Sequence, residues 1–380
     1  MTAAEVAFWI LVFCPIYSMG LYPLLMLMLG RIVRRRFIRE PITPPVSLII
    51  AAFNEEKAIA AKLENSLALD YPHDRLEILV ASDASTDRTD DLVRAFESRG
   101  VRLLRFEGGL GKSAMLNAAA ANAAGDILCF SDATGMWSAE SVRAMAAHFA
   151  DPRVGCVSGW VKYRYGNSVT AQGFGVYQRF VMALRRAEAA FGAGVNAPGS
   201  IHAVRRSAFV PSPPDTFMDM ADPFHTACQG LRTTFEESAV SVEESRTRPK
   251  DEFQARVRIN LRSWRFMFYA LTRFPLLRSP MYCFQLVSHK FLRWLIGPSL
   301  IPILALNIVL AGERPIYRVT LAMQAAFYLL TIAGFVSDRL GVRLRGLSGL
   351  VFFNAVNWAY VVALVKYLAG RRARRWVPSR

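Results

Sequence analysis

The stretch GDILCFSDAT, residues 125–134, decides the fold. Its apolar part, Ile127 to Phe130, predicts a buried strand, and the carboxylate of Asp132 follows directly. In an open α/β sheet, ligands bind beyond the carboxyl ends of the strands. A carboxylate at that place can hold a ribose, or a metal ion that bridges a diphosphate. The stretch therefore predicts one strand of a nucleotide-binding sheet.

A second predicted strand ends in an acid in the same way. Residues 76–81 are largely apolar, and Ser82-Asp83 follows them, with Asp87 placed to cap the next helix. Two acidic strand ends in one sheet favour a nucleotide site over a pair of capped turns. We therefore expect Asp83 to contact the uracil or the ribose of a nucleotide.

Strands alternate with helices over the first half of the chain. Residues 46–53 form a continuous apolar run, which is typical of a strand buried on both faces of a sheet. Asn54 is expected to cap a helix that begins directly after this strand. A third strand is predicted at residues 101–106. The alternation predicts a parallel sheet with right-handed crossovers.

Gly111-Lys112-Ser113 resembles the end of a P-loop. The full pattern requires a glycine five residues before Gly111, and that position holds Phe106, so the P-loop is excluded. Gly111 and Lys112 still stand at the start of a predicted helix, where anions are favoured. We expect both to contact a diphosphate.

Apolar and charged residues are segregated along the 380-residue chain, which is 53% hydrophobic and 20% charged. Residues 6–29 are long and apolar enough to cross a bilayer, and arginines follow them, which predicts a retained anchor with the following domain in the cytoplasm. Further spans are predicted at residues 291–310, 316–336 and 347–368. The expected organisation is an anchor with a basic flank (1–40), an α/β domain (41–250), amphipathic interface helices (251–290), membrane spans (291–370) and a basic tail (371–380).

The C-terminal topology stays open. One span before the domain and three after it place both termini outside, yet the basic loop 339–345 and the tail 371–375 favour the cytoplasmic side. Much of the net charge of +16 lies beside apolar spans, where basic residues meet anionic lipids, so we expect no nucleic-acid partner. The five cysteines form no CxxC pair, which predicts reduced thiols and no zinc site.

Two further acids, Asp219 and Asp222, are expected on a loop before a helix, far along the chain from the first strands. If this loop folds over the edge of the sheet, one of them can act as a general base, which requires hydrogen-bond reach of the proton that it removes. His202 lies on an otherwise apolar predicted strand. We interpret it as a buried core histidine rather than a ligand.

Taken together, these residues resemble the family 2 glycosyltransferases, inverting enzymes with a GT-A fold, over roughly residues 46–268. The segments that carry the resemblance follow the family's order: Val46–Glu56, Ser82–Thr89 with Ala84 in place of a glycine, Gly111–Asn117, Gly125–Thr134 and Gly199–Arg206. The resemblance implies an α/β GT-A (Rossmann-like) domain in the cytoplasm, joined to transmembrane and interfacial helices.

The resemblance also implies roles for individual residues. Asp219 takes the place of the catalytic base, with Asp222 as the fallback. Asp132 is the first acid of the metal motif, but Thr134 replaces the second, so a Mg²⁺ or Mn²⁺ ion would depend on Asp132, the diphosphate and water. The motif of the processive synthases is absent, and its place holds two arginines that can meet the diphosphate. The residues expected to contact the donor are Ala52, Asn54, Glu55, Asp83, Gly111, Lys112, Asp132, Arg256 and Arg258.

The function that these expectations favour is transfer of a sugar from a nucleotide-sugar, with UDP as the expected nucleotide, to a lipid, lipid-linked or glycan acceptor at the membrane. The expected location is a bacterial-type inner membrane, and an oligomer or a complex is compatible with the sequence. Two alternatives stay open: a processive polysaccharide synthase, and a membrane subunit of a glycan-assembly complex whose nucleotide site is degenerate.

Overall fold

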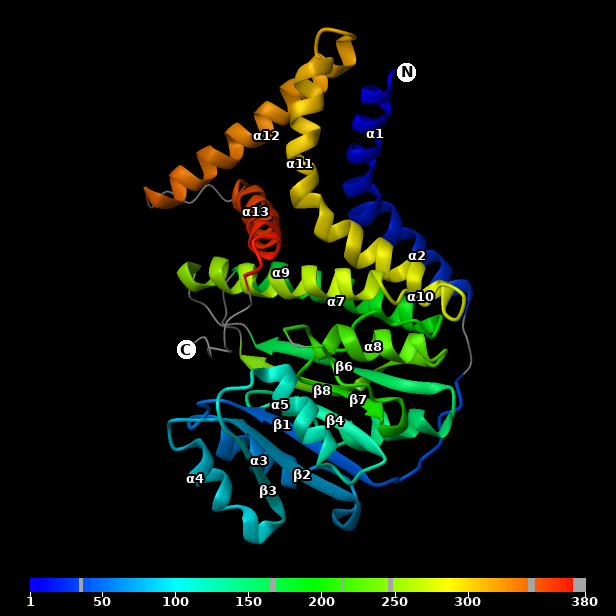
Figure 1. Cartoon of the computed structure of the whole chain (residues 1–380), viewed down its shortest axis with the longest axis vertical. Helices are drawn as coiled ribbons and strands as arrows, with labels where there is room; N and C mark the ends of the chain where they lie inside the picture. The colour runs from blue at the N-terminus through cyan, green and yellow to red at the C-terminus, as the bar shows by residue number, and fades with distance from the viewer. Residues whose placement is uncertain (34–36, 165–168, 214, 245–248, 341–345, 372–380) are drawn as a thin grey trace. The chain divides into compact units, whose positions relative to one another are not determined.

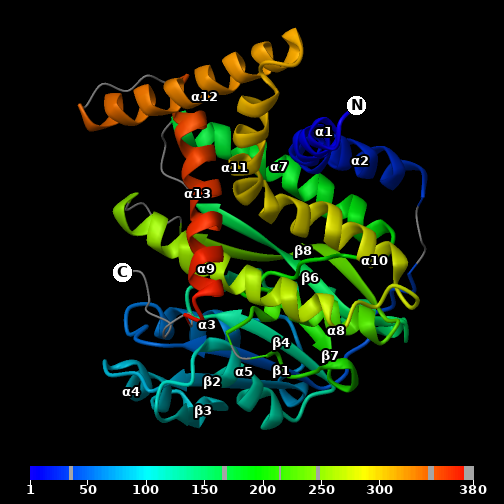
Figure 2. The same cartoon turned by 45° about the horizontal axis from the view of Figure 1, so that its top comes forward.

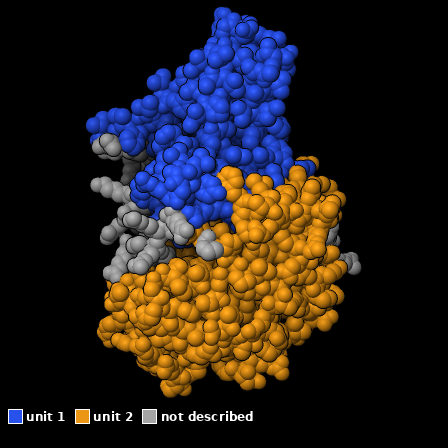
Figure 3. Space-filling model, in the orientation of Figure 1, with its two compact units in different colours: residues 1–25, 248–267, 286–373 blue, residues 26–247, 268–285, 374–380 orange. Residues whose placement is uncertain are grey.

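The computed structural model describes residues 1–33, 37–164, 169–213, 215–244, 249–340 and 346–371. The chain divides into two compact units (Figures 1–3). The α/β unit comprises residues 26–247 and 268–285. The helical unit comprises residues 1–25, 248–267 and 286–373.

An eight-stranded sheet forms the centre of the α/β unit, with the strand order β3-β2-β1-β4-β7-β6-β8-β5. Strands β3, β2, β1 and β4 are mutually parallel, as predicted, but β7 is antiparallel to both β4 and β6, so the sheet is mixed. The bounds are β1 (Val46–Ala52), β2 (Leu76–Asp83), β3 (Val101–Phe106), β4 (Ile127–Asp132), β5 (Met136–Trp137), β6 (Val154–Arg164), β7 (His202–Arg205) and β8 (Arg232–Glu244).

Helices cover both faces of this sheet, and β1 is buried at every position. Leu48 and Ile50 of β1 pack with Leu63 of α3 on one face, whereas Ile49 and Met115 of α5 lie in the cluster on the other face. This two-sided burial is the reason for the uninterrupted apolar runs in the sequence. The helices of the unit are α3 (Ile59–Leu67), α4 (Thr89–Arg94), α5 (Lys112–Ala121), α6 (Ser141–Ala146), α7 (Val169–Ala190) and α8 (Met218–Cys228).

A buried carboxylate joins the segment before β1 to the sheet. Glu236 of β8 accepts a hydrogen bond from His148 at 2.8 Å and pairs with Arg39 at 2.9 Å. Burial raises the pKa of Glu236, but the hydrogen bonds from His148 and Ser238 and the charge of Arg39 outweigh burial and leave the pKa at about 2. The ionised carboxylate therefore stabilises the folded state.

Replacing Glu236 with Gln is expected to lower the free energy of unfolding at pH 7 by on the order of 2–3 kcal/mol, because this stabilisation is then lost. The folded pKa lies below the ordinary value, so the wild-type advantage is full above about pH 4.5 and disappears as the pH falls towards about 2. Thermal unfolding of the detergent-solubilised wild type and variant between pH 7 and pH 3 measures this difference in stability. Glu64→Gln, at an exposed pair with Arg99, is the matched control.

Four helices of the described residues are long and apolar enough to cross a membrane: Ala3–Ile32, Pro280–Leu310, Pro315–Ser337 and Ser348–Leu368. They match the predicted spans, although the first and second are longer than predicted. A π-helical segment interrupts each of these two, and Ser18 in one segment donates to the carbonyl of Ser288 in the other at 3.0 Å. The elements are α1 (Ala3–Ile16), α2 (Tyr22–Ile32), α9 (Pro249–Leu271), α10 (Pro280–Gln285), α11 (Leu292–Leu310), α12 (Pro315–Arg339) and α13 (Ser348–Leu368).

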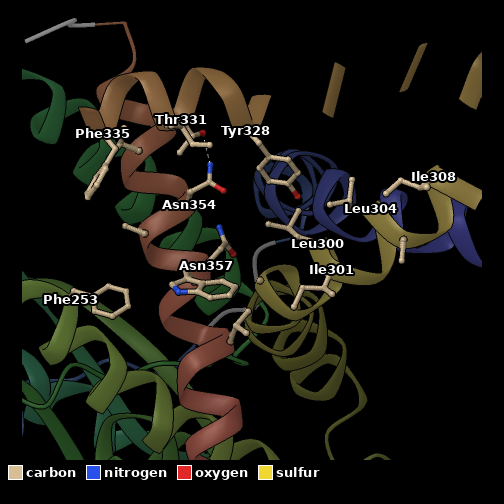
Figure 4. Close-up of a pocket in the computed structure, with 17 residues that line it drawn as sticks. Phe253, Leu300, Ile301, Leu304, Ile308, Tyr328, Thr331, Phe335, Asn354 and Asn357 are labelled. Atoms are coloured by element: carbon tan, nitrogen blue, oxygen red, sulfur yellow. Dashed lines mark hydrogen bonds between the residues drawn. The ribbon is translucent and has the colours of Figure 1, made fainter. Parts of the chain in front are cut away.

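A cavity of about 880 Å³ lies between α11, α12 and α13 in the helical unit. Figure 4 shows Leu300 and Leu304 of α11, Thr331 of α12 and Asn354 of α13 around it, with the Asn354 amide donating to Thr331 at 2.9 Å. Its lining is otherwise predominantly apolar. All three helices are candidate membrane spans, so such a lining suits contact with hydrocarbon rather than water.

Candidate functional site

The carboxyl ends of the parallel strands form the candidate site of the α/β unit. Ala51 of β1 pairs with Asp132 of β4, and Ala52 pairs with Ser82 of β2, so the three strands end at one level. Asp83 and Asp132 therefore end strands that flank β1 on either side at the same edge. The prediction that both acidic strand ends belong to one sheet is confirmed.

Asp83 fixes the loop that precedes α5. Its carboxylate accepts hydrogen bonds from the backbone N–H groups of Leu110 at 2.6 Å and Gly111 at 2.9 Å, and the side chain is buried. Gly111 has φ +84°, a conformation that suits glycine, and Lys112 begins the helix directly after it. Asp83 thus places the helix N-terminus at the sheet edge.

Lys112 joins this helix N-terminus to the end of β4. Its ammonium forms an ion pair with the carboxylate of Asp132, and both side chains are partly exposed. Gly199, in the loop before β7, lies close by, since a Cβ on it would stand 3.7 Å from the Lys112 ammonium. Asp83, Lys112 and Asp132 are therefore brought together, with the 192–199 loop beside them.

The turn after β1 differs from the prediction. Asn54 does not cap a helix, because α3 begins only at Ile59 and the Asn54 side chain accepts a hydrogen bond from the backbone N–H of Thr86 at 2.8 Å. The backbone N–H of Glu55 donates to the Thr89 hydroxyl at 2.8 Å. Asn54 and Glu55 thus hold the β1 and β2 turns together, next to the buried Ala52 at the end of β1.

Ala84 occupies a left-handed backbone conformation with φ +55°, at the position where the family resemblance leads us to expect a glycine. We expect Ala84→Gly to raise the free energy of unfolding by about 0.5–1 kcal/mol, because relief of the left-handed strain exceeds the added entropy of the unfolded chain. Thermal unfolding of the full chain measures it. Gly111→Ala, which adds a Cβ at positive φ, is expected to shift the midpoint in the opposite direction, and a lower midpoint for Ala84→Gly would contradict the argument.

Asp219 and Asp222 lie inside α8 and not on a loop before a helix, which corrects the prediction. Asp219 is half-buried in the first turn, and its backbone carbonyl accepts a hydrogen bond from Ala197 N–H at 2.8 Å. The hydroxyl of Ser113 in α5 donates to the carbonyl of Thr216 at 2.6 Å. The start of α8 therefore lies beside the start of α5 and the 192–199 loop.

Asp222 points into the interior instead. Its carboxylate is 3.0 Å from Nε2 of His202, and both side chains are almost fully buried. The other ring nitrogen of His202 is 2.8 Å from the carbonyl of Pro198, and the ring stacks on Phe130. The expectation that His202 is a buried core histidine is confirmed. Asp222 has no access to an acceptor hydroxyl in this arrangement, so only Asp219 keeps the role of candidate base.

A divalent cation at this edge would have one protein carboxylate, Asp132, with the Thr134 hydroxyl two residues further on. Among the described residues no group of three or more His, Cys, Asp or Glu side chains could hold a metal ion. Mg²⁺ is often held by one or two carboxylates together with substrate phosphates and water. The donor set fits a cation that is bound together with a diphosphate and does not form a site of protein ligands alone.

The structure places Arg256 and Arg258 on α9 in the helical unit, where Arg256 lies over the ring of Phe352 at 4.8 Å. Their expected contact with the diphosphate stays a prediction. A residue that the sequence reasoning did not single out lies in the α/β unit. Lys62 of α3 is fully buried, and its ammonium donates to the carbonyl of Gly135 at 2.6 Å.

The mixed, doubly covered sheet has the architecture of a GT-A α/β domain, and its acidic and basic side chains lie at the carboxyl edge of the parallel strands, where ligands bind in open α/β sheets. Residues 47–210 match the family model "Glycosyl transferase family 2". Residues 47–210 therefore form a family 2 glycosyltransferase domain.

Curated relatives agree with this assignment over shorter segments. The chain is 41% identical over 95 residues to a probable glycosyltransferase YdaM of Bacillus subtilis, which is 24% of this chain and 23% of the relative. It is 34% identical over 118 residues to a beta-monoglucosyldiacylglycerol synthase of Synechocystis, which is 30% and 25% of the two chains. These alignments span about a quarter of each relative's length.

A solved structure matches almost the whole fold. The mannosyltransferase PcManGT from Pyrobaculum calidifontis, in complex with GDP-Man and Mn²⁺, superposes with a TM-score of 0.73 at 23% identity. The match covers 96% of this chain and 100% of that chain. It shows that the two proteins share their fold.

Proposed function

We propose that the chain is a membrane-bound inverting glycosyltransferase that moves a sugar from a nucleotide-sugar to a lipid, lipid-linked or glycan acceptor. The observation that carries the proposal is the junction of Asp83, Lys112 and Asp132 at the carboxyl edge of the sheet, with the start of α8 close to the same loop. These groups suit a nucleotide and its diphosphate, and Asp219 stands at the start of α8.

The donor binds with its diphosphate at the N-terminus of α5, where the helix dipole and the Lys112 ammonium offset its charge. Asp83 holds the backbone of that helix start, and its proposed contact is with the ribose or the base of the nucleotide. A Mg²⁺ or Mn²⁺ ion, bound by Asp132 and the diphosphate, would neutralise further charge on the leaving group.

Transfer is a single displacement in which the carboxylate of Asp219 takes the proton of the acceptor hydroxyl. The acceptor oxygen then forms a bond to the anomeric carbon, and the bond from that carbon to the β-phosphate oxygen breaks. The electron pair leaves with the nucleoside diphosphate, and the anomeric configuration inverts. Preorganised positive charge at the leaving group favours this transition state.

The four apolar helices support a membrane location, and the arginines after the first of them favour a cytoplasmic α/β unit. We further propose the organisation given above: anchor, α/β domain, interface helices, membrane spans and basic tail. A lipid acceptor draws support from the name of the glucosyldiacylglycerol synthase relative, and a glycan acceptor from a poly-beta-1,6-N-acetyl-D-glucosamine synthase of Staphylococcus aureus, 26% identical over 168 residues, 43% of this chain and 40% of that protein.

A donor panel tests the proposal. Purified protein in lipid nanodiscs is incubated with radiolabelled UDP- and GDP-sugars and a membrane lipid extract, and products are separated by chain length. Lipid products with one or a few sugars support the proposal, whereas long polymers would assign a processive synthase. A failure of every donor both to bind and to transfer would instead favour the degenerate-subunit alternative.

A further inference from the structure

Lys62 is a buried basic residue next to the candidate site. It lies on α3 with its side chain fully buried, and a buried ammonium is costly unless it is paired and hydrogen-bonded. Its contacts are the carbonyl of Gly135 at 2.6 Å and the ring of Trp137, whose centroid is 5.1 Å away. Both contacts lie just beyond Asp132.

The turn that follows β4 is held from α3 at two points. Besides the Lys62 contact with Gly135, the Asn65 amide donates to the carbonyl of Trp137 at 2.8 Å and accepts from its N–H at 2.8 Å. The indole N–H of Trp137 in turn donates to the carbonyl of Ser200, beside the 192–199 loop. The hydrogen bonds of Asn65 hold the turn without any charge, so geometry alone does not require a lysine at position 62.

The charge of Lys62 acts on Asp132 from one side of the sheet. Burial lowers the pKa of Lys62 to about 7, and the charges of Asp132 and Glu243 act on it in the opposite sense. The ammonium is therefore within electrostatic reach of Asp132, from the side of the sheet that α3 covers. On the side of α5, Lys112 pairs with the same carboxylate. Two lysines thus act on the end of β4, where Thr134 takes the place of a second metal-motif acid.

We propose that Lys62 is a positioning residue for the donor: its buried ammonium holds the 132–135 turn and supplies positive potential to a nucleoside diphosphate bound at Asp132. This inference rests on the proposed function. A buried charge in a medium of low dielectric constant acts over a longer distance than a solvated one. Such a fixed charge offsets part of the negative charge of the diphosphate, next to a cation site that has a single carboxylate.

The test compares binding of nucleoside diphosphates and nucleosides without turnover. UDP and GDP are titrated calorimetrically into the full-length protein in nanodiscs, and uridine and guanosine are measured by ligand-observed NMR. At pH 6, below the pKa of Lys62, Lys62→Met is expected to weaken diphosphate binding about tenfold, the effect of one charge acting across about 10 Å at an effective dielectric constant of about 20. Nucleoside affinity is expected to stay within twofold.

Two variants separate charge from structure. Lys62→Gln keeps a donor for Gly135 without the charge, and is expected to behave like Lys62→Met; it also serves if the methionine variant does not fold. Asn65→Leu removes the other clamp but keeps the charge, and is expected to weaken diphosphate and nucleoside together. Equal diphosphate affinity in a folded Lys62→Met or Lys62→Gln variant, or a parallel loss of nucleoside affinity, would overturn the inference alone. A wild-type protein that binds no nucleotide would overturn the proposed function as well.

Discussion

Replacing Asp219 with Asn is expected to lower the turnover number about 10²- to 10⁴-fold, the usual contribution of a positioned general base. The amide has nearly the same shape as the carboxylate but cannot take the acceptor proton. Asp219 is half-buried in the first turn of α8, and its backbone contact with Ala197 does not depend on the side chain. Because Asn has nearly the same shape as Asp, donor affinity and the unfolding midpoint are expected to change little.

Single-turnover transfer from the preferred donor measures the loss of activity, and calorimetric titration of the nucleoside diphosphate measures the affinity of the donor site. Asp222→Asn is the matched control on the same helix. Because Asp222 faces His202 in the interior, this variant is expected to lower the unfolding midpoint more than the activity of the folded fraction. If Asp219→Asn kept full turnover while Asp222→Asn lost it, the two assignments would have to be exchanged.

The sequence predicted the parts of this fold that depend on continuous apolar runs. Strands β1 and β4 are buried on both faces, so nearly every side chain carries the signal, and the acid at the end of β4 stands out against it. The same reasoning did not predict the antiparallel β7, because a four-residue strand has the same apolar pattern in either direction. Pairing direction depends on the long connections, which local patterns do not encode.

The errors at the candidate site share one cause, which is that polar side chains have several possible partners. Asn54 has the composition of a helix cap, yet it holds the neighbouring β2 turn. The family resemblance ranked Asp219 before Asp222, but the sequence did not show that Asp222 faces the interior, where it pairs with His202. For Lys62 one signal existed: it stands three residues after the buried Ile59, so it falls on the apolar face of α3. A lysine there is usually taken as a solvated residue, and its burial becomes visible only in three dimensions.

Replacing Asp132 with Asn is expected to lower transfer about 10²- to 10³-fold, because the carboxylate would hold the cation that neutralises the leaving diphosphate, a contribution of several kcal/mol. The readout without turnover is the gain in UDP or GDP affinity on addition of Mn²⁺, which is expected in the wild type and absent in the variant. Asp91→Asn, at an exposed pair with Arg94, is the control and should retain that gain.

Because Asp132 pairs with Lys112, the change in diphosphate affinity without metal distinguishes two possible roles of Asp132. If Asp132 served only to hold Lys112, its removal would release the ammonium to the diphosphate, and affinity without metal would rise. If Asp132 holds a cation, affinity without metal changes little and the metal-dependent gain is lost. Combining Asp132→Asn with Lys112→Met decides between them. If Asp132 only holds Lys112, the double variant loses the affinity that Asp132→Asn gained. If Asp132 holds a cation, Lys112→Met lowers only the affinity measured without metal, and Asp132→Asn abolishes only the gain in affinity on addition of metal.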